Sequence, residues 1–217
     1  MYLRVKLSID NDLRNPTEDD CQWQVASFQR GHVNTRSRED FTGIGWRRKL
    51  AVGTAFLLHY QEHGSCRWSL FDGTYEDLSD ADGIAWFERP SDMGAKDYAG
   101  RERDCRTFLA CYTDWCNGDG LGWHVDVIDG DLDNDGEPVG TGIEVESDSC
   151  WGYFASDSAY FCAEVAATVR HFQAKWATEV GYTLPLIFEG DADYLRADVE
   201  TALLAYDAVK ETATCAT

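Results

Sequence analysis

Between Arg106 and Arg170 the chain contains no lysine or arginine, although the same segment carries thirteen aspartates and glutamates. An unpaired charge is too costly to bury, and these carboxylates have no basic neighbours in the sequence. Most of them must therefore lie at the surface, where they create a negative field that extends over about a Debye length, ~8–10 Å at physiological salt. Any fold of this chain has to keep most of these carboxylates in contact with water.

The charge is also divided unevenly between the two halves of the sequence. Residues 1–106 hold 18 acidic and 15 basic side chains, whereas residues 107–217 hold 21 and 4, so that −17 of the total net charge of −20 belongs to the second half. The first half instead gathers basic side chains between Arg30 and Lys49. We predict an electrically polar molecule.

Composition and the N-terminal pattern indicate an ordinary folded chain. The 217 residues include 8 Trp, 10 Tyr and 10 Phe, which is enough to build a core. No apolar run approaches the ~20 residues of a membrane-spanning helix. The opening MYLRVKLSID alternates like a strand and lacks the pattern of an export signal. We therefore expect a cytoplasmic chain without membrane association, whose eight cysteines are reduced and mostly buried thiols.

Hydrophobic periodicity predicts an α+β fold, with a mixed or antiparallel sheet packed against about four helices and an acidic β-hairpin. The expected strands lie near residues 2–9, 22–29, 66–71, 83–88, 121–128 and 142–146. The expected helices lie near residues 46–63, 95–117, 157–180 and 191–210. No repeat or proline-rich linker divides the chain. We predict a single α+β domain over residues 1–181, with residues 182–217 as a C-terminal helical attachment of the same unit.

The acidic segment is predicted to form the tip of a hairpin. Its Asp, Asn and Gly residues tolerate turn geometry, and the sequence on either side of them is typical of strands. Carboxylates held on such a hairpin form a candidate surface for a binding partner. The predicted partner-binding residues are Asp126, Asp129, Asp131, Asp133, Asp135, Glu137, Glu144, Glu146 and Asp148.

The same segment resembles the first half of a calcium-binding loop. With Asp131 as position one, Asp133, Asp135 and Gly136 fall at positions three, five and six, but Gly142 stands at position twelve in place of the bidentate glutamate. A weak divalent-cation site and a solvated acidic turn are both compatible with this pattern, and the strand-like flanks favour the turn.

A second metal pattern is the segment from His59 to His63, which matches H-x-x-E-H. On the predicted helix 46–63, two histidines four residues apart would share one face and could ligate zinc while the glutamate acts on water. Gly64 ends that helix too early, and no third ligand is evident. No other catalytic signature occurs, no cofactor is predicted, and a chain of net charge −20 is not expected to bind nucleic acid directly.

Four segments together resemble a group of acidic bacteriophage and mobile-element proteins for which no activity is established. The resemblance covers roughly residues 10–165 and is carried by WRRKLAVGTAFLLHYQEHGSCRWSL, IAWFERPSDMGAK, FLACYTDWCNGDGLGWHV and DSCWGYFASD. It implies no catalytic residue and no cofactor. It does imply a setting, that of a phage accessory protein inside a bacterial host cell.

The setting and the charge together favour an interaction protein. Carboxylates along a rigid hairpin can replace phosphates and steer onto a basic groove. We therefore predict an acidic DNA mimic that inhibits a host nucleic-acid enzyme or defence system, with a basic groove of a host protein as its partner. Two alternatives stay open, namely acidity that serves only solubility in a protein of unrelated role and a zinc- or calcium-dependent enzyme.

Overall fold

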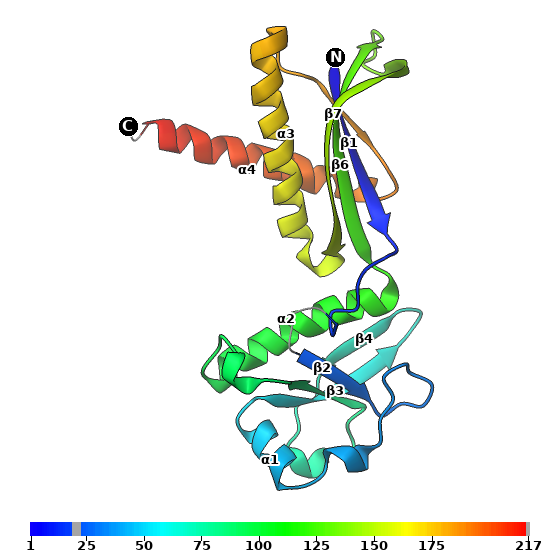
Figure 1. Ribbon diagram of the computed structural model, residues 1–217, viewed down its shortest axis with the longest axis vertical. Coiled ribbons are helices and arrows are strands. Elements are labelled where there is room, and N and C mark those ends of the chain that lie inside the picture. Colours follow the sequence, from blue (N-terminus) through cyan, green and yellow to red (C-terminus); the bar gives the residue numbers. More distant parts are fainter. Residues whose placement is uncertain (19–22, 216–217) are drawn as a thin grey trace. The chain divides into compact units, whose positions relative to one another are not determined.

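The computed structural model describes residues 1–18 and 23–215, with side chains up to residue 209 (Figure 1). The described chain contains four α-helices and two four-stranded sheets, which confirms the predicted α+β class. Residue 22 of the predicted strand 22–29 and Cys21 among the predicted thiols lie outside the described residues.

The chain divides into two units, each with its own sheet. The first joins Met1–Leu13 to Asp119–Thr217, and we call it the acidic unit; the second, Arg14–Gly118, lies between these segments in the sequence, and we call it the inserted unit. The predicted boundary near residue 181 falls inside the acidic unit and not between the two units.

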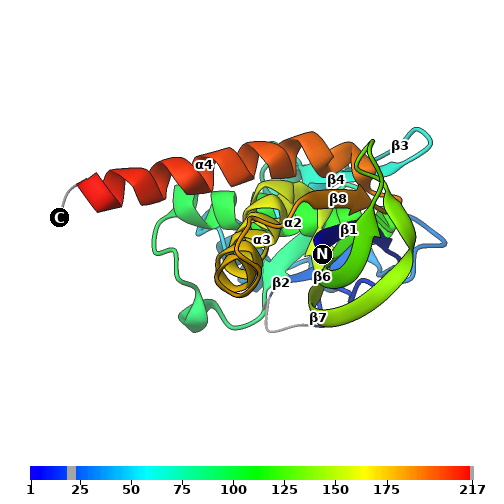
Figure 2. The ribbon, with the colours of Figure 1, turned by 90° about the horizontal axis from the view of Figure 1, so that it is seen from above.

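The sheet of the acidic unit has the strand order β7-β6-β1-β8. Its strands are β1 (Tyr2–Asp10), β6 (Gly120–Leu132), β7 (Pro138–Phe154) and β8 (Leu186–Glu189). β1 is antiparallel to β6 and parallel to β8, while β6 and β7 form one long antiparallel hairpin. The helices α3 (Ser158–Val180) and α4 (Arg196–Cys215) lie on one face of this sheet, where α4 crosses α3 (Figures 1 and 2).

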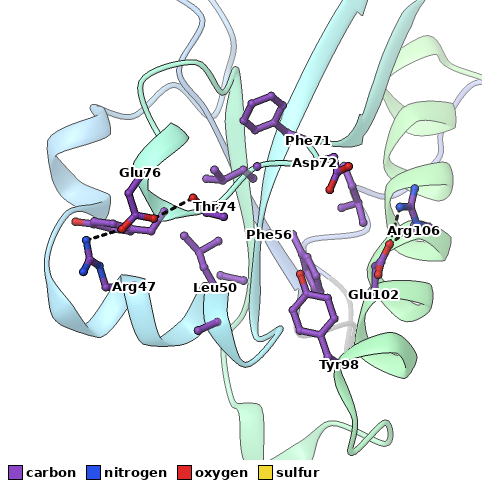
Figure 3. Close-up of a pocket in the computed structure, with 16 residues that line it drawn as sticks. Arg47, Leu50, Phe56, Phe71, Asp72, Thr74, Glu76, Tyr98, Glu102 and Arg106 are labelled. Atoms are coloured by element: carbon purple, nitrogen blue, oxygen red, sulfur yellow. Dashed lines mark hydrogen bonds and ion pairs between the residues drawn. The ribbon is translucent and has the colours of Figure 1, made fainter.

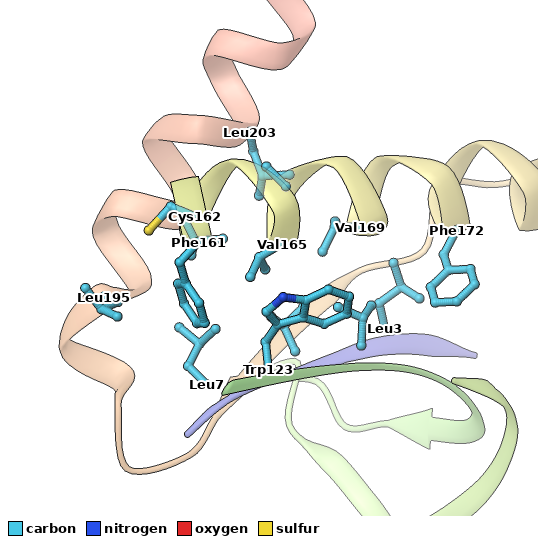
Figure 4. Packing of buried hydrophobic residues seen from close by; sticks show 14 of the residues in the cluster. Leu3, Leu7, Trp123, Phe161, Cys162, Val165, Val169, Phe172, Leu195 and Leu203 are labelled. Atoms are coloured by element: carbon cyan, nitrogen blue, oxygen red, sulfur yellow. The ribbon is translucent and has the colours of Figure 1, made fainter. Parts of the chain in front are cut away.

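The core of the acidic unit lies between this sheet and the two helices (Figure 4). Alternate residues of β1, such as Leu3 and Leu7, are fully buried, as period-2 patterning requires of a strand with one covered face. Trp123 on β6 packs with them against Phe161 and Val165 of α3. The stripe of apolar residues along α3 is the one predicted from its helical spacing.

The inserted unit is built on an antiparallel sheet of order β2-β5-β3-β4. Its strands are β2 (Trp23–Ser27), β5 (Gly83–Phe87), β3 (Ala55–Glu62) and β4 (Cys66–Leu70). One face packs with α2 (Tyr98–Asn117) around a cluster rich in aromatic rings, and a second cluster on alternate strand residues includes side chains of α1 (Ile44–Ala51). Both faces of the central strands are therefore covered.

The predicted helix 46–63 is wrong. α1 ends at Ala51, Gly53 takes a positive φ of 71°, and the chain continues as the strand β3. The run from Ala55 to Leu58 is buried at every position because both faces of β3 are covered. A continuous short apolar run of this kind fits a doubly covered strand as well as it fits a buried helix. β8 was not expected, and β7 is longer at both ends than the predicted strand 142–146.

The cysteines match their prediction only in part. Of the six cysteines described with side chains, Cys105 and Cys162 are buried. Cys150 is exposed on β7, and Cys66 and Cys116 line a cavity of the inserted unit. Burial of these thiols is therefore less general than their apolar character suggested.

Candidate functional site

The β6–β7 hairpin ends in a tight turn between Asp133 and Glu137, as the sequence predicted. One carboxylate oxygen of Asp133 accepts the backbone N–H groups of Asp135 and Glu137, both at 2.9 Å. Gly136 takes a positive φ of 85°, a conformation that costs little only for glycine. The side chain of Asp133 therefore closes the turn, so that the turn has one defined shape.

Six of the nine predicted partner-binding carboxylates are exposed on this end of the hairpin, and we call them the acidic tip. They are Asp129, Asp131, Asp133, Asp135, Glu137 and Glu144. Among the side chains that the structure describes, none of the six has a lysine or arginine within ion-pair distance. The tip is thus a cluster of exposed charges without internal neutralisation.

Two of the other three carboxylates are neutralised, which corrects the expectation that the whole set lacks partners. Asp126 is buried and accepts the Arg4 guanidinium at 2.8 and 3.0 Å. Glu146 accepts Lys175 at 2.6 and 2.8 Å and the indole N–H of Trp176 at 2.8 Å. The hydrogen bond from Lys175, followed by that from Trp176, holds the pKa of Glu146 below its usual range.

The register of the hairpin separates the remaining carboxylates. Glu146 pairs with Val127 and Asp148 with Val125, so both stand on the face that α3 covers. A bulge between Val127 and Ile128 shifts the pairing by one residue, so that Glu144 pairs with Ile128. Glu144 therefore stands on the face of the sheet away from α3. The nine carboxylates do not form one straight row; six gather at the tip and Asp148 stands apart.

The zinc interpretation of His59 and His63 is wrong. His59 lies on β3, and His63 follows the end of that strand instead of lying on a helix. Two residues four apart on a strand are separated by about 13 Å along its axis, which is too far for one metal ion. His59 instead places Nδ1 3.4 Å from Asp82.

The calcium interpretation also lacks a ligand set. Asp131 belongs to β6, Asp133 is engaged with backbone N–H groups, and Asp135 lies in the turn. Among the side chains described in residues 1–18 and 23–209, no three of His, Cys, Asp or Glu gather closely enough to hold a metal ion.

The inserted unit contains a cavity of about 430 Å³ that sequence reasoning missed (Figure 3). Its apolar wall includes Phe56, and an ion pair lies on each side. Arg47 contacts Glu76 at 2.7 Å, and Arg106 contacts Glu102 at 2.6 Å. Because each arginine already faces a carboxylate, the cavity offers an anion no unneutralised guanidinium. No catalytic arrangement follows from it.

The Glu76 carboxylate in this cavity is fixed by more than its arginine. Its own backbone N–H, and then the Thr74 hydroxyl at 2.9 Å, hold the pKa of Glu76 below the usual range. Arg47 also lies over the ring of Tyr75, 5.0 Å from its centroid. Within the basic cluster between Arg30 and Lys49, Arg47 is therefore already bound by Glu76 and Tyr75.

Comparisons with protein-family models, with curated proteins and with solved structures find no match for this chain. The resemblance to acidic phage proteins thus stays a prediction. Within the described part of the chain, no helix has both the length and the apolar character needed to cross a bilayer.

Proposed function

We propose that this chain is an interaction protein whose acidic tip occupies a basic groove of a partner in place of nucleic-acid phosphates. The observation that supports this proposal is the group of six exposed carboxylates at the tip, none of which pairs with a described lysine or arginine. Exposed carboxylates attract cations from the surrounding solution. A basic groove that accepts several of these carboxylates releases counterions on both sides, as it does with DNA.

The charge of the acidic unit as a whole supports the same function. This unit carries 22 acidic and 6 basic side chains, a net charge of −16. A field of this sign accelerates encounter with a positive groove and repels nucleic acid itself. The tip would then set the orientation of docking, and the rest of the unit would set the rate.

The base of the hairpin is held on both sides of the sheet. The pair Arg4–Asp126 lies on the face away from the helices, and the pair Lys175–Glu146 lies on the helix face. Together with the turn closed by Asp133, these contacts limit the motion of the strands that carry the tip. A rigid array of charges loses little conformational entropy on binding, which favours recognition.

The resemblance to phage accessory proteins suggests the cytoplasm of a bacterial host as the setting. In that setting we propose a nucleic-acid enzyme or a defence system as the partner and inhibition as the outcome. A partner that binds phosphates in a basic groove would lose access to DNA while the acidic tip is bound.

The test is capture of host proteins on the immobilised full-length chain at increasing salt. We expect recovery of a nucleic-acid enzyme that duplex DNA elutes, with at least a tenfold loss of capture between 0.05 and 0.2 M NaCl. The variant Asp131→Asn, Asp133→Asn, Asp135→Asn should lose the capture and the inhibition, because asparagine removes the charge but can still accept the hydrogen bonds of the turn.

A matched control removes three exposed charges from the inserted unit, by Asp40→Asn, Asp80→Asn and Glu88→Gln. Capture should survive in this control. Equal losses in both triple variants would show that total charge, and not the tip, determines binding. Capture that ignores salt, or recovery of no nucleic-acid enzyme, would leave acidity for solubility as the better explanation.

A further inference from the structure

A second cavity of the inserted unit has a volume of about 550 Å³ and is walled by aromatic rings. We call it the ring pocket. Four of its rings follow one another in contact: the ring centroids are 4.9 Å apart for Tyr60 and Trp68, 6.2 Å for Trp68 and Tyr112, and 5.5 Å for Tyr112 and Trp115. The imidazole of His32 adjoins Tyr60 at 4.6 Å. Interplanar angles between 36° and 72° make this wall curved and not a flat stack.

The fold brings these rings together from distant positions in the sequence. Tyr60 and Trp68 are cross-strand partners in the β3–β4 hairpin, so their rings stand on the same face of the sheet. Tyr112 and Trp115 are three residues apart on α2 and therefore share one face of the helix. The loop that follows β2 supplies His32 and completes the wall.

Hydrogen bonds fix the positions of β4, α2 and the loop after β2 relative to one another. The Asn117 side chain accepts the backbone N–H of Cys66 at 2.8 Å and donates to its carbonyl at 3.1 Å, which fixes β4 to α2. Asn34 donates to the Tyr112 hydroxyl at 2.9 Å and to the Val25 carbonyl at 3.0 Å. The pocket is therefore formed before any ligand arrives.

Among the described residues that line the pocket, Glu62 carries the one formal charge, and none is a lysine or arginine. Glu62 makes no ion pair with a described side chain and is exposed at the pocket. Desolvation raises the pKa of Tyr112, and desolvation, followed by the adjacent Cys66, raises the pKa of Cys116 to about 12. Both groups stay neutral near pH 7, which leaves Glu62 to set the charge of the pocket.

We propose that the ring pocket binds an organic cation of the methylated ammonium type, with Glu62 as its counter-ion. Ring faces attract a cation electrostatically, and a curved aromatic wall suits a compact, rounded cation better than a flat base. A methylated ammonium is weakly hydrated and needs no hydrogen-bond acceptors from the wall. This binding is independent of the acidic tip.

Titration calorimetry of the full-length chain tests the proposal with choline and with its uncharged carbon analogue, 3,3-dimethyl-1-butanol. We expect choline to bind at least about fivefold more tightly than the alcohol, since only the cation gains from the rings and from Glu62. Equal affinities would reduce the site to an apolar pocket and overturn the proposal. Absence of choline binding up to about 50 mM would overturn it as well.

Two variants locate the binding. Glu62→Gln and Trp115→Leu change side chains that are not buried in the core, and each should weaken choline binding at least about threefold. Glu88→Gln, which removes an exposed charge elsewhere in the same unit, should leave the affinity unchanged. Unaltered affinity in both pocket variants, with near-ultraviolet circular dichroism as the check on folding, would contradict the assignment.

The source of the methylated ammonium group is a separate arm of the same experiment. Choline and a short peptide that contains trimethyllysine present the same head group on different carriers. Tighter binding of the peptide would assign the site to a modified protein, and tighter binding of choline would assign it to a small molecule. Either result supports the proposal, whereas unmethylated lysine peptide bound as tightly as the trimethylated one would refute it.

Discussion

The acidic unit and the inserted unit have the same numbers of strands and α-helices but differ in surface and core. Each has a four-stranded sheet and two α-helices. The acidic unit carries a net charge of −16 and the inserted unit −4. Aliphatic side chains dominate the core of the first, whereas rings such as Trp23 and Phe108 build one core of the second, whose margin forms the ring pocket.

The two cavities described above lie in the inserted unit, whereas most of the net negative charge lies in the acidic unit. Acidity that served only solubility is expected to spread over both units instead of concentrating in one. The uneven division instead favours a surface for a large charged partner on one unit and a concave site for a small ligand on the other. The following predictions test whether the two units are as distinct as this comparison holds.

The largest expected effect comes from creating a cavity in the hydrophobic core of one unit. Phe161→Ala in the acidic unit should lower its free energy of unfolding by about 3–5 kcal/mol, because the ring is fully buried. Thermal unfolding should then show an early transition that leaves the near-ultraviolet signal of the ring pocket in place. Phe108→Ala is the mirror variant and should affect the inserted unit first. One shared transition in both variants would show a single cooperative unit and remove the basis of the comparison.

A smaller effect is expected at Asp82 in the inserted unit. Burial alone would raise its pKa, but hydrogen bonds from the backbone N–H of Tyr60 at 2.9 Å, from His59 at 3.4 Å and from Gln29 at 2.6 Å outweigh burial and lower it. A depressed pKa in the folded state stabilises the fold above the unfolded pKa of about 3.9, and this contribution is lost as the pH falls through the folded value.

Asp82→Asn should therefore destabilise the inserted unit by about 1–3 kcal/mol at pH 7. Denaturant unfolding of both proteins between pH 7 and pH 2.5 measures the difference, which should shrink as the pH falls below about 4. A difference that stays constant over this range would mean that the carboxylate charge has no part in the stability of the unit.

Salt should separate the units further. Raising NaCl from 0.05 to 0.5 M screens repulsion among exposed charges, and the acidic unit has more to gain. We expect its unfolding transition to rise by more than that of the inserted unit, by a few degrees at most. Potassium chloride at the same ionic strength serves as the control for ion-specific effects. Equal shifts would indicate that the repulsion within the acidic unit is unimportant for its stability.

The smallest expected change is in the stability of the tip variant. Asp131→Asn, Asp133→Asn, Asp135→Asn should alter the free energy of unfolding by no more than about 0.5 kcal/mol, since exposed charges contribute little and asparagine preserves the turn. Asp133→Ala should cost about 1 kcal/mol, because two backbone N–H groups lose their acceptor. Similar values for the two variants would deny Asp133 its role in closing the turn.

Local signals were sufficient for much of the fold. The turn residues between Asp133 and Glu137 predicted the hairpin, and the spacing of apolar residues predicted α2 and α3. The prediction failed at Ala55–Leu58, where an apolar run is ambiguous between a helix and a strand that is covered on both faces. The zinc hypothesis at His59 failed for the same reason, since it depended on that helix.

The candidate sites depended more on tertiary contacts. Arg4 neutralises Asp126 across 122 positions of the sequence, and Lys175 reaches Glu146 across 29. No local pattern in the sequence reveals such pairs. The prediction therefore counted Asp126 and Glu146 among the carboxylates without a basic partner, although each has one. The ring pocket draws His32, Trp68 and Tyr112 from separate elements, and only the paired register of β3 and β4 with the position of α2 brings them together.

The place at which the inserted unit interrupts the chain affects the order in which the protein can form. Asp10 at the end of β1 pairs with Gly120 at the start of β6, yet 105 residues of the inserted unit are made between them. At a ribosomal rate of roughly 5–20 residues per second, β1 waits on the order of 5–20 s for its neighbour. During synthesis the inserted unit can therefore fold first, while the acidic unit consists only of the unpaired strand β1 until the rest of its sequence is made.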